Sequence, residues 1–246
     1  MYALLKKEIS VFLSSLIGYI VISVFLVSMG LIMWVLPQEF MDSNILEGGY
    51  AGIDPLFVLA PWLFLFLIPA VTMRSFAEEK RSGTMELLLT RPISDMQIVL
   101  AKFFACVLLV VLALLPTLVY YISVYKLGNP PGNIDSGRTW GSYLGLLFLA
   151  SGFVSIGVFA SAITGNQVIS FIVAVILCFF CYAGFGYLGG SSQSGIVGNF
   201  IQQLGISAHY SSMSRGVIDT RDVLYFVSIS AIFLLMSRVS IESRKW

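Results

Sequence analysis

The chain has 246 residues, of which 58% are hydrophobic and 11% are charged, and its formal net charge at pH 7 is +1. A soluble domain carries about 25% charged residues, so the composition excludes an ordinary soluble domain and indicates a membrane protein. Because the net charge is only +1 and no basic patch is present, a nucleic-acid partner is not expected. The length suits a single transmembrane domain over residues 1–246, surrounded by membrane lipid.

The N-terminal part predicts an interfacial helix followed by a first span. Residues 1–12 mix apolar and charged side chains in the pattern of a helix that lies in the membrane interface. Residues 9–38 then carry no charge. A secretory signal has an apolar region of only about 7–15 residues. We therefore expect a retained span at about 13–36.

Two further spans flank a charged loop. The second span is expected at about 55–73, where Pro61 and Pro69 should bend the helix. The third is expected at about 103–125, with a kink near Pro116. Nine charged residues lie between them, within 74–102, so this loop must be in water.

The C-terminal half predicts three more spans, at about 141–163, 168–188 and 223–240. Small residues in the fourth span stand four positions apart, a spacing that allows helices to approach closely in lipid; they are Gly141, Gly145, Gly157 and Ser161. The segment 189–222 is rich in Gly and Ser, with an apolar stripe from Ile196 to Leu204. We expect a short helix there, lying flat or re-entrant.

The loop 74–102 has the residues of an ordered structure. Ser82-Gly83-Thr84 provides a turn and a hydroxyl cap, and strong helix formers follow it. Pro92 should end this helix after about two turns. Ser94 and Gln97 fit a capping box that begins the next helix. A helix this short needs a docking surface to be stable.

The run from Glu78 to Ser94 reads E-E-K-R-S-G-T-M-E-L-L-L-T-R-P-I-S. It resembles the cytoplasmic loop of type-2 ABC transporter permeases, without insertions. The resemblance implies an all-α permease whose coupling helix, between the second and third spans, docks on a separate ABC ATPase that binds the ATP and Mg. The residues expected to dock the ATPase are Glu78, Glu79, Lys80, Arg81, Gly83, Thr84, Glu86, Leu87, Leu88 and Pro92. Leu87, Leu88 and the neighbouring Leu89 would fill an apolar cleft or brace the helix.

Orientation follows from the positions of Lys and Arg, which favour the cytoplasmic side. Ten of the 14 lie in the N-terminus, the loop 74–102 and the C-terminus. Six spans with both termini in the cytoplasm of a bacterial inner membrane is the consistent arrangement. The loop then faces the compartment where an ATPase can reach it.

The resemblance extends over the whole chain, including the outer helical segment before the last span. The run Gly216–Ser228, G-V-I-D-T-R-D-V-L-Y-F-V-S, is similar to a narrower subgroup, the permease subunits of the ABC transporter associated with gliding motility. This similarity implies an exporter-type complex linked to gliding motility. The wider resemblance to type-2 permeases implies that a second permease half, identical or related, completes a dimer.

The sequence contains no motif that indicates catalysis or cofactor binding. No stretch fits G-x-x-x-x-G-K-[ST], so the chain is not expected to be an enzyme or to bind a cofactor, and ATP hydrolysis belongs to a partner. The cysteines lie in apolar runs and are expected to be packing residues rather than metal or redox ligands; they are Cys106, Cys178 and Cys181.

Two alternatives stay open. A stand-alone secondary transporter or channel is disfavoured because the predicted spans contain no Asp, Glu, Lys, Arg or His, apart from Arg238, which can snorkel at the end of the sixth. Ion sites built from backbone would leave no such trace. An intramembrane enzyme needs a nucleophile beside a base. The lone His209 lies among serines outside the spans, where a solvated surface is the simpler interpretation, so no catalytic residue is expected.

Overall fold

The structure is a computed structural model and describes residues 2–37, 39, 43–85, 93–190 and 195–243. Its regular elements in these ranges are all helical, with no strand. In chain order they are α1 (Tyr2–Ser14), α2 (Leu16–Trp34), α3 (Asp54–Thr72), α4 (Ala77–Arg81), α6 (Asp95–Leu114), the 3-10 segment η1 (Leu115–Thr117), α7 (Leu118–Leu127), α8 (Ser136–Ile163), α9 (Gln167–Phe179), the π-helical segment η2 (Phe180–Gly184), α10 (Phe185–Gly190), α11 (Gly195–Gln203), α12 (Ile206–Met213) and α13 (Thr220–Glu242).

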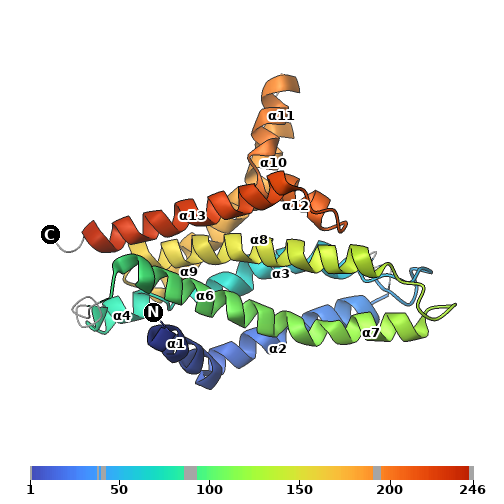
Figure 1. Cartoon of the computed structure of the whole chain (residues 1–246), viewed down its shortest axis with the longest axis horizontal. Coiled ribbons are helices and arrows are strands. Elements are labelled where there is room, and N and C mark those ends of the chain that lie inside the picture. Colours follow the sequence, from blue (N-terminus) through green and yellow to red (C-terminus); the bar gives the residue numbers. More distant parts are fainter. Residues whose placement is uncertain (1, 38, 40–42, 86–92, 191–194, 244–246) are drawn as a thin grey trace.

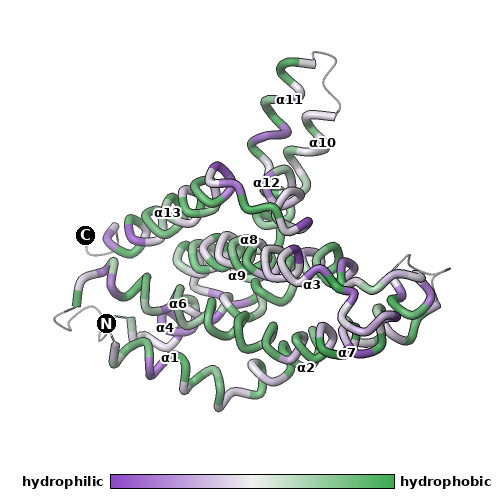
Figure 2. The backbone as a smooth tube through the Cα atoms, turned by 45° about the vertical axis from the view of Figure 1, so that its right-hand side comes forward, coloured by the Kyte–Doolittle hydropathy of each residue, from purple (hydrophilic) through white to green (hydrophobic). Residues whose placement is uncertain are grey.

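Six stretches of the described residues are helical, long and apolar enough to cross a membrane. They are Leu16–Trp34, Asp54–Arg81, Asp95–Leu127, Ser136–Ile163, Gln167–Gly190 and Thr220–Glu242. The predicted all-α class with six spans is confirmed. The helices form one bundle whose hydrophobic stretches run along its length (Figure 2). Both chain ends and α4 lie at one end of the bundle, here called the terminal end, and the loops after α2 and α7 lie at the distal end (Figure 1).

Helix α8 is the centre of the bundle and packs against α3, α6, α9, α12 and α13. Its small residues make these contacts possible. A Cβ atom on Gly145 would lie 2.5 Å from the Cβ of Met213 in α12, and one on Gly157 would collide with Thr72 of α3. The close helix approach predicted from the spacing of small residues is therefore confirmed.

Prolines affect two spans differently. Pro61 and Pro69 lie inside α3, which nevertheless continues from Asp54 to Thr72. Pro116 lies in η1, where the helix tightens to 3-10 geometry between α6 and α7. Such a stretch inside a helix marks a local irregularity, and it occurs where the sequence predicts a kink.

The helices α10 and α11 pack against each other and form an arm that stands out from the side of the bundle, across the direction of the spans (Figure 1). α11 confirms the short helix expected from Ile196 to Leu204. The side chain of Ile196 is 89% exposed and that of Phe200 is 64% exposed. The arm is joined to α9 through the π-helical segment η2.

Candidate functional site

Helix α4, which opens the loop singled out by the sequence, begins on a cap from another helix. The backbone N–H groups of Phe76 and Ala77 donate to Oγ of Ser161 in α8, at 2.9 and 3.0 Å. The Ser161 hydroxyl donates in turn to the carbonyl of Met73 at 3.0 Å. A helix start is usually capped by its own N-cap side chain, and Phe76 at that position provides none. Ser161 therefore fixes the start of α4 to the central helix.

The end of α8 is the next attachment point. Lys80 of α4 donates from Nζ to the carbonyl of Ala162, and Ser240 of α13 donates to the same oxygen at 3.1 Å. The last four carbonyls of a helix have no partner within it. Because α8 ends at Ile163, the Ala162 carbonyl is one of these, and α4, α8 and α13 meet at a single oxygen.

A group of charges, here called the ion cluster, consists of Glu8, Glu79 and Lys102, which are largely buried, and Lys7, which is exposed. Lys102 of α6 is only 1% exposed. Its Nζ lies 3.2 Å from Oε1 of Glu8 and 2.9 Å from Oε1 of Glu79, and 5.1 Å from the centre of the Phe76 ring. Lys7 lies 3.9 Å from Glu79, so two cations balance two carboxylates. Buried charges are tolerated when they are paired, and this pairing joins α1, α4 and α6.

Comparison with known families identifies the bundle. A family model described as "ABC-2 family transporter protein" matches residues 2–241. The chain belongs to this family. As an ABC-2 family protein with six apolar helices it is a multi-pass membrane protein and the permease subunit of an ABC transporter. ABC-2 permeases typically work with an ABC ATPase. No curated protein matches the chain.

The residues expected to dock the ATPase divide into three groups. Glu78, Arg81, Gly83 and Thr84 are exposed at the terminal end, and Gly83 has a positive φ of 70° in the turn after α4. Glu79 and Lys80 turn toward this chain's own α6 and α8. Glu86, Leu87, Leu88, Leu89 and Pro92, and with them the coupling helix itself, lie outside the described residues.

The expectation that the interior of the spans carries no charged residue is wrong for the third span, because Lys102 lies inside α6. It assumed a third span beginning at Phe103, whereas α6 begins at Asp95. The predicted capping box at Ser94 and Gln97 is present and starts the helix two turns earlier, so Lys102 lies within it. Its pairing with Glu8 and Glu79 accounts for the charge as part of the fold, which leaves the argument against an ion-coupled carrier in place.

The contributions of Glu8, Lys102 and Ser161 were missed, although two of them left a signal. Glu8 stands four residues from both Leu4 and Phe12, on the buried face of α1. Lys102 likewise follows Ile98 by four residues on the buried face of α6. A charge at an apolar position of a periodic stripe indicates a buried pair. Ser161 could be recognised in the sequence only as a small residue that allows close helix packing.

The distal end holds the lone histidine in a polar group, rather than in solvent as expected. Nδ1 of His209 lies 2.7 Å from Oδ1 of Asp222, and its ring stacks on Tyr225 with centroids 3.9 Å apart. The Ser212 hydroxyl donates to Asp222 and to the backbone carbonyl of His209, the latter at 3.0 Å, and not to the imidazole ring. A nucleophile needs a base within hydrogen-bond reach, so this arrangement does not activate the serine.

Another residue of α12 fastens the distal end. The Tyr210 hydroxyl donates to the carbonyl of Phe57 in α3 at 2.7 Å, and burial raises the pKa of this hydroxyl well above its usual value. Within the part of the chain that the structure describes, no three His, Cys, Asp or Glu side chains are grouped to hold a metal ion. The distal end thus has the chemistry of a structural joint.

Proposed function

We propose that this ABC-2 permease subunit is driven by a separate ABC ATPase that docks on its terminal end, at residues 78–94. One observation supports this proposal above the others: α4, which opens that loop, is fastened to four other helices. Glu79 joins α4 to α1 and α6 through Lys102, while Ser161 and the Ala162 carbonyl join it to α8 and α13. A solvated tether would need none of these contacts.

The contacts suggest how a push on the loop would reach the membrane. The ATPase would hold the ATP and Mg and change shape as it uses them, displacing α4. Packed interfaces respond to such displacements as units, by small shifts of whole helices. Because α4 is tied to the ends of α6, α8 and α13, these helices would tilt together. Pro116, at the 3-10 break between α6 and α7, is a natural position for the change of direction.

The wider assignment rests on charge and resemblance. The distribution of Lys and Arg favours a cytoplasmic terminal end in a bacterial inner membrane. A second permease half, identical or related, would complete the transport path. The similarity of Gly216–Ser228 to permeases linked to gliding motility favours an exporter-type complex of that kind.

The docking experiment uses Arg81, which is exposed and makes no hydrogen bond or ion pair with any residue that the structure describes. Arg81→Glu should reduce the ATPase that copurifies in mild detergent about tenfold or more, the effect of losing a charge-assisted hydrogen bond of about 1.5–3 kcal/mol. The ATPase is identified by mass spectrometry through its Walker motif, and its amount is measured relative to the permease.

The matched control is Arg221→Glu, which reverses an exposed arginine near the distal end and should leave the copurified ATPase unchanged. Glu86→Lys, chosen from the sequence alone, should act like Arg81→Glu. Equal retention of the ATPase by the parent and by Arg81→Glu would show that the docking surface lies elsewhere.

A further inference from the structure

A polar hollow of about 220 Å³ opens beside the ion cluster. It lies between α1 and the start of α2 on one side and the turn after α3, α4 and α6 on the other. Its walls carry three basic and three acidic side chains: Lys7, Arg74, Lys102, Glu8, Glu78 and Glu79. The hollow is therefore close to neutral as a whole. Four of these six charges are the ion cluster and pair with one another.

The other two charges have no partner among the residues that the structure describes. Neither the guanidinium of Arg74 nor the carboxylate of Glu78 makes a hydrogen bond or ion pair with any residue that the structure describes. Nε of Arg74 is buried without an acceptor, and Oε2 of Glu79 is buried without a donor. A buried polar group left unpaired is costly, so the hollow needs both an acceptor for Arg74 and a donor for the carboxylates.

The missing acceptor and donor indicate which polar headgroup a bound molecule would carry. A phosphate accepts several hydrogen bonds from a guanidinium, and an ammonium that carries N–H groups donates to carboxylates. An anionic head without the ammonium would provide no donor for Glu78 or for Oε2 of Glu79. A quaternary ammonium has no N–H to donate. The charges therefore fit a zwitterion with a phosphate and a primary ammonium.

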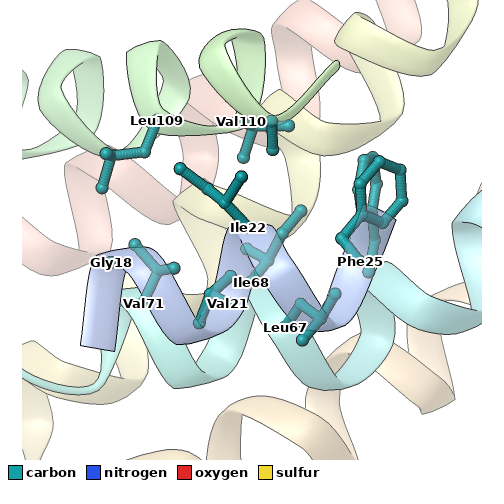
Figure 3. A pocket seen from close by; sticks show the side chains of 11 residues that line it. Gly18, Val21, Ile22, Phe25, Leu67, Ile68, Val71, Leu109 and Val110 are labelled. Carbon is teal, nitrogen blue, oxygen red and sulfur yellow. The ribbon is translucent and has the colours of Figure 1, made fainter. Parts of the chain in front are cut away.

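The surroundings define the rest of the occupant. One helical turn deeper into the bundle, α2 and α3 line a slot whose walls are wholly apolar, between Gly18 and Ile22 on one helix and Val71 on the other (Figure 3). Leu109 and Val110 of α6 close it from the opposite side, facing Ile22 (Figure 3). The slot is narrow, about 20 Å³, so an acyl chain would lie along its mouth beside the exposed apolar face of α2.

We propose that this hollow binds a phospholipid with a zwitterionic, primary-amine headgroup of the phosphatidylethanolamine type. Arg74 binds its phosphate, Glu78 and Oε2 of Glu79 accept from its ammonium, and its acyl chain follows α2. The lipid belongs to the leaflet at the terminal end. Only the description of that leaflet as cytoplasmic rests on the proposed function. Bound there, it fastens the interfacial helix α1 to α4.

The test measures which lipids the whole chain retains. The purified protein is reconstituted in vesicles of equal parts phosphatidylethanolamine, phosphatidylcholine and phosphatidylglycerol, extracted in mild detergent and analysed by native mass spectrometry. The parent should retain phosphatidylethanolamine in preference to both other lipids. Arg74→Gln should lower that retention about tenfold, as expected for one lost charge-assisted contact, and Arg74→Lys should restore part of it. Glu78→Gln should reduce the preference for phosphatidylethanolamine over phosphatidylcholine.

The controls are Arg221→Gln and Glu39→Gln, which neutralise exposed charges toward the distal end and should leave lipid retention unchanged. Three results would overturn the proposal: equal retention by Arg74→Gln and the parent, a parent preference for phosphatidylglycerol, or no parent discrimination against phosphatidylcholine. The measurement does not involve an ATPase, so it can fail while the docking experiment succeeds, and the reverse.

Discussion

The two ends of the bundle are held together by different chemistry. At the terminal end, the buried Lys102 pairs with Glu8 and Glu79 and joins three helices. At the distal end, hydroxyls bond to backbone carbonyls, as Ser142 does to Ser214 at 2.9 Å, and glycines allow close contact. A distal ion pair, Arg138 with Asp54, has side chains that are 43% and 30% exposed, so it contributes little.

This difference shows how each end responds to damage. Removing one charge from a buried pair leaves its partner uncompensated, so the terminal end should fail as a unit. Removing one neutral hydrogen bond costs little more than that bond, so the distal end should fail contact by contact. Under the proposed function, the ATPase displaces the terminal end. The ion cluster suits this role because the helices that it joins cannot move separately.

The largest expected effect concerns which end faces the cytoplasm. In a background without Cys106, Cys178 and Cys181, a cysteine replaces either Glu47 or Ser82. Because Lys and Arg favour the cytoplasmic side, Glu47→Cys should react with an impermeant thiol reagent in intact cells. Ser82→Cys should react only after the membrane is opened.

Labelling is followed by gel shift, and the opened membrane serves as the control that both cysteines are reachable. The reverse pattern would place α4 and its loop outside the cell and remove the basis for ATPase docking.

The next effect is on stability at the terminal end. Lys102→Met leaves Glu8 and Glu79 with only the more distant and exposed Lys7 as a cation, and should destabilise the fold by up to about 3–5 kcal/mol. Thermal unfolding in detergent measures it. Neutralising the partners as well, with Glu8→Gln and Glu79→Gln in the same chain, should recover most of the loss. A single variant as stable as the parent would show that the ion cluster contributes nothing.

At the distal end a smaller effect is expected from overpacking. Gly145→Leu forces a side chain against Met213 and should cost about 1–3 kcal/mol, measured in the same unfolding experiment. Gly137→Leu makes the identical substitution on the first turn of α8, where a Cβ meets only a side-chain oxygen at 3.5 Å. It should leave the unfolding temperature nearly unchanged. Equal losses in both variants would contradict the close contact.

The smallest effect tests whether the Ala162 carbonyl depends on both of its donors. Ser240→Ala removes the donor from α13, while Lys80 still bonds the same oxygen. The expected loss is about 0.5–1.5 kcal/mol. Ser243→Ala, which removes an exposed hydroxyl at the C-cap of α13, is the control. A loss as large as that of Lys102→Met would mean that this junction, and not the ion cluster, governs the terminal end.

Much of the fold was predictable because it depends on neighbours in the sequence. Apolar runs predicted the six spans, the Ser94 and Gln97 pair predicted the start of α6, and Pro116 predicted the irregularity before α7. Each of these signals acts within one or two helical turns. The spacing of glycines in α8 also predicted close packing, although not that Met213 and Thr72 would be the neighbours.

The arrangement at the terminal end was not predictable in the same way. The pairing of Lys102 with Glu8 joins residues 94 positions apart, and a single sequence gives no measure of such a contact. Lys102 was assigned to the loop because a charge beside a span usually marks the membrane boundary. Glu79 is expected to dock the ATPase because of the resemblance of the run Glu78–Ser94, and that expectation stays a prediction. In the structure Glu79 pairs with Lys102 of the same chain, a contact that the resemblance does not indicate.

The π-helical segment Phe180–Gly184 has a consequence for the direction of the arm. A π turn accommodates one residue more than an α turn, and each residue of an α-helix advances the side-chain direction by about 100°. The extra residue therefore acts as a fixed rotation between α9, which packs on the bundle, and α10, which leaves it. Shortening this segment by one residue would turn Ile196 and Phe200 toward another side without altering the arm's own sequence. The direction in which the arm presents its side chains thus depends on the number of residues in the span that precedes it.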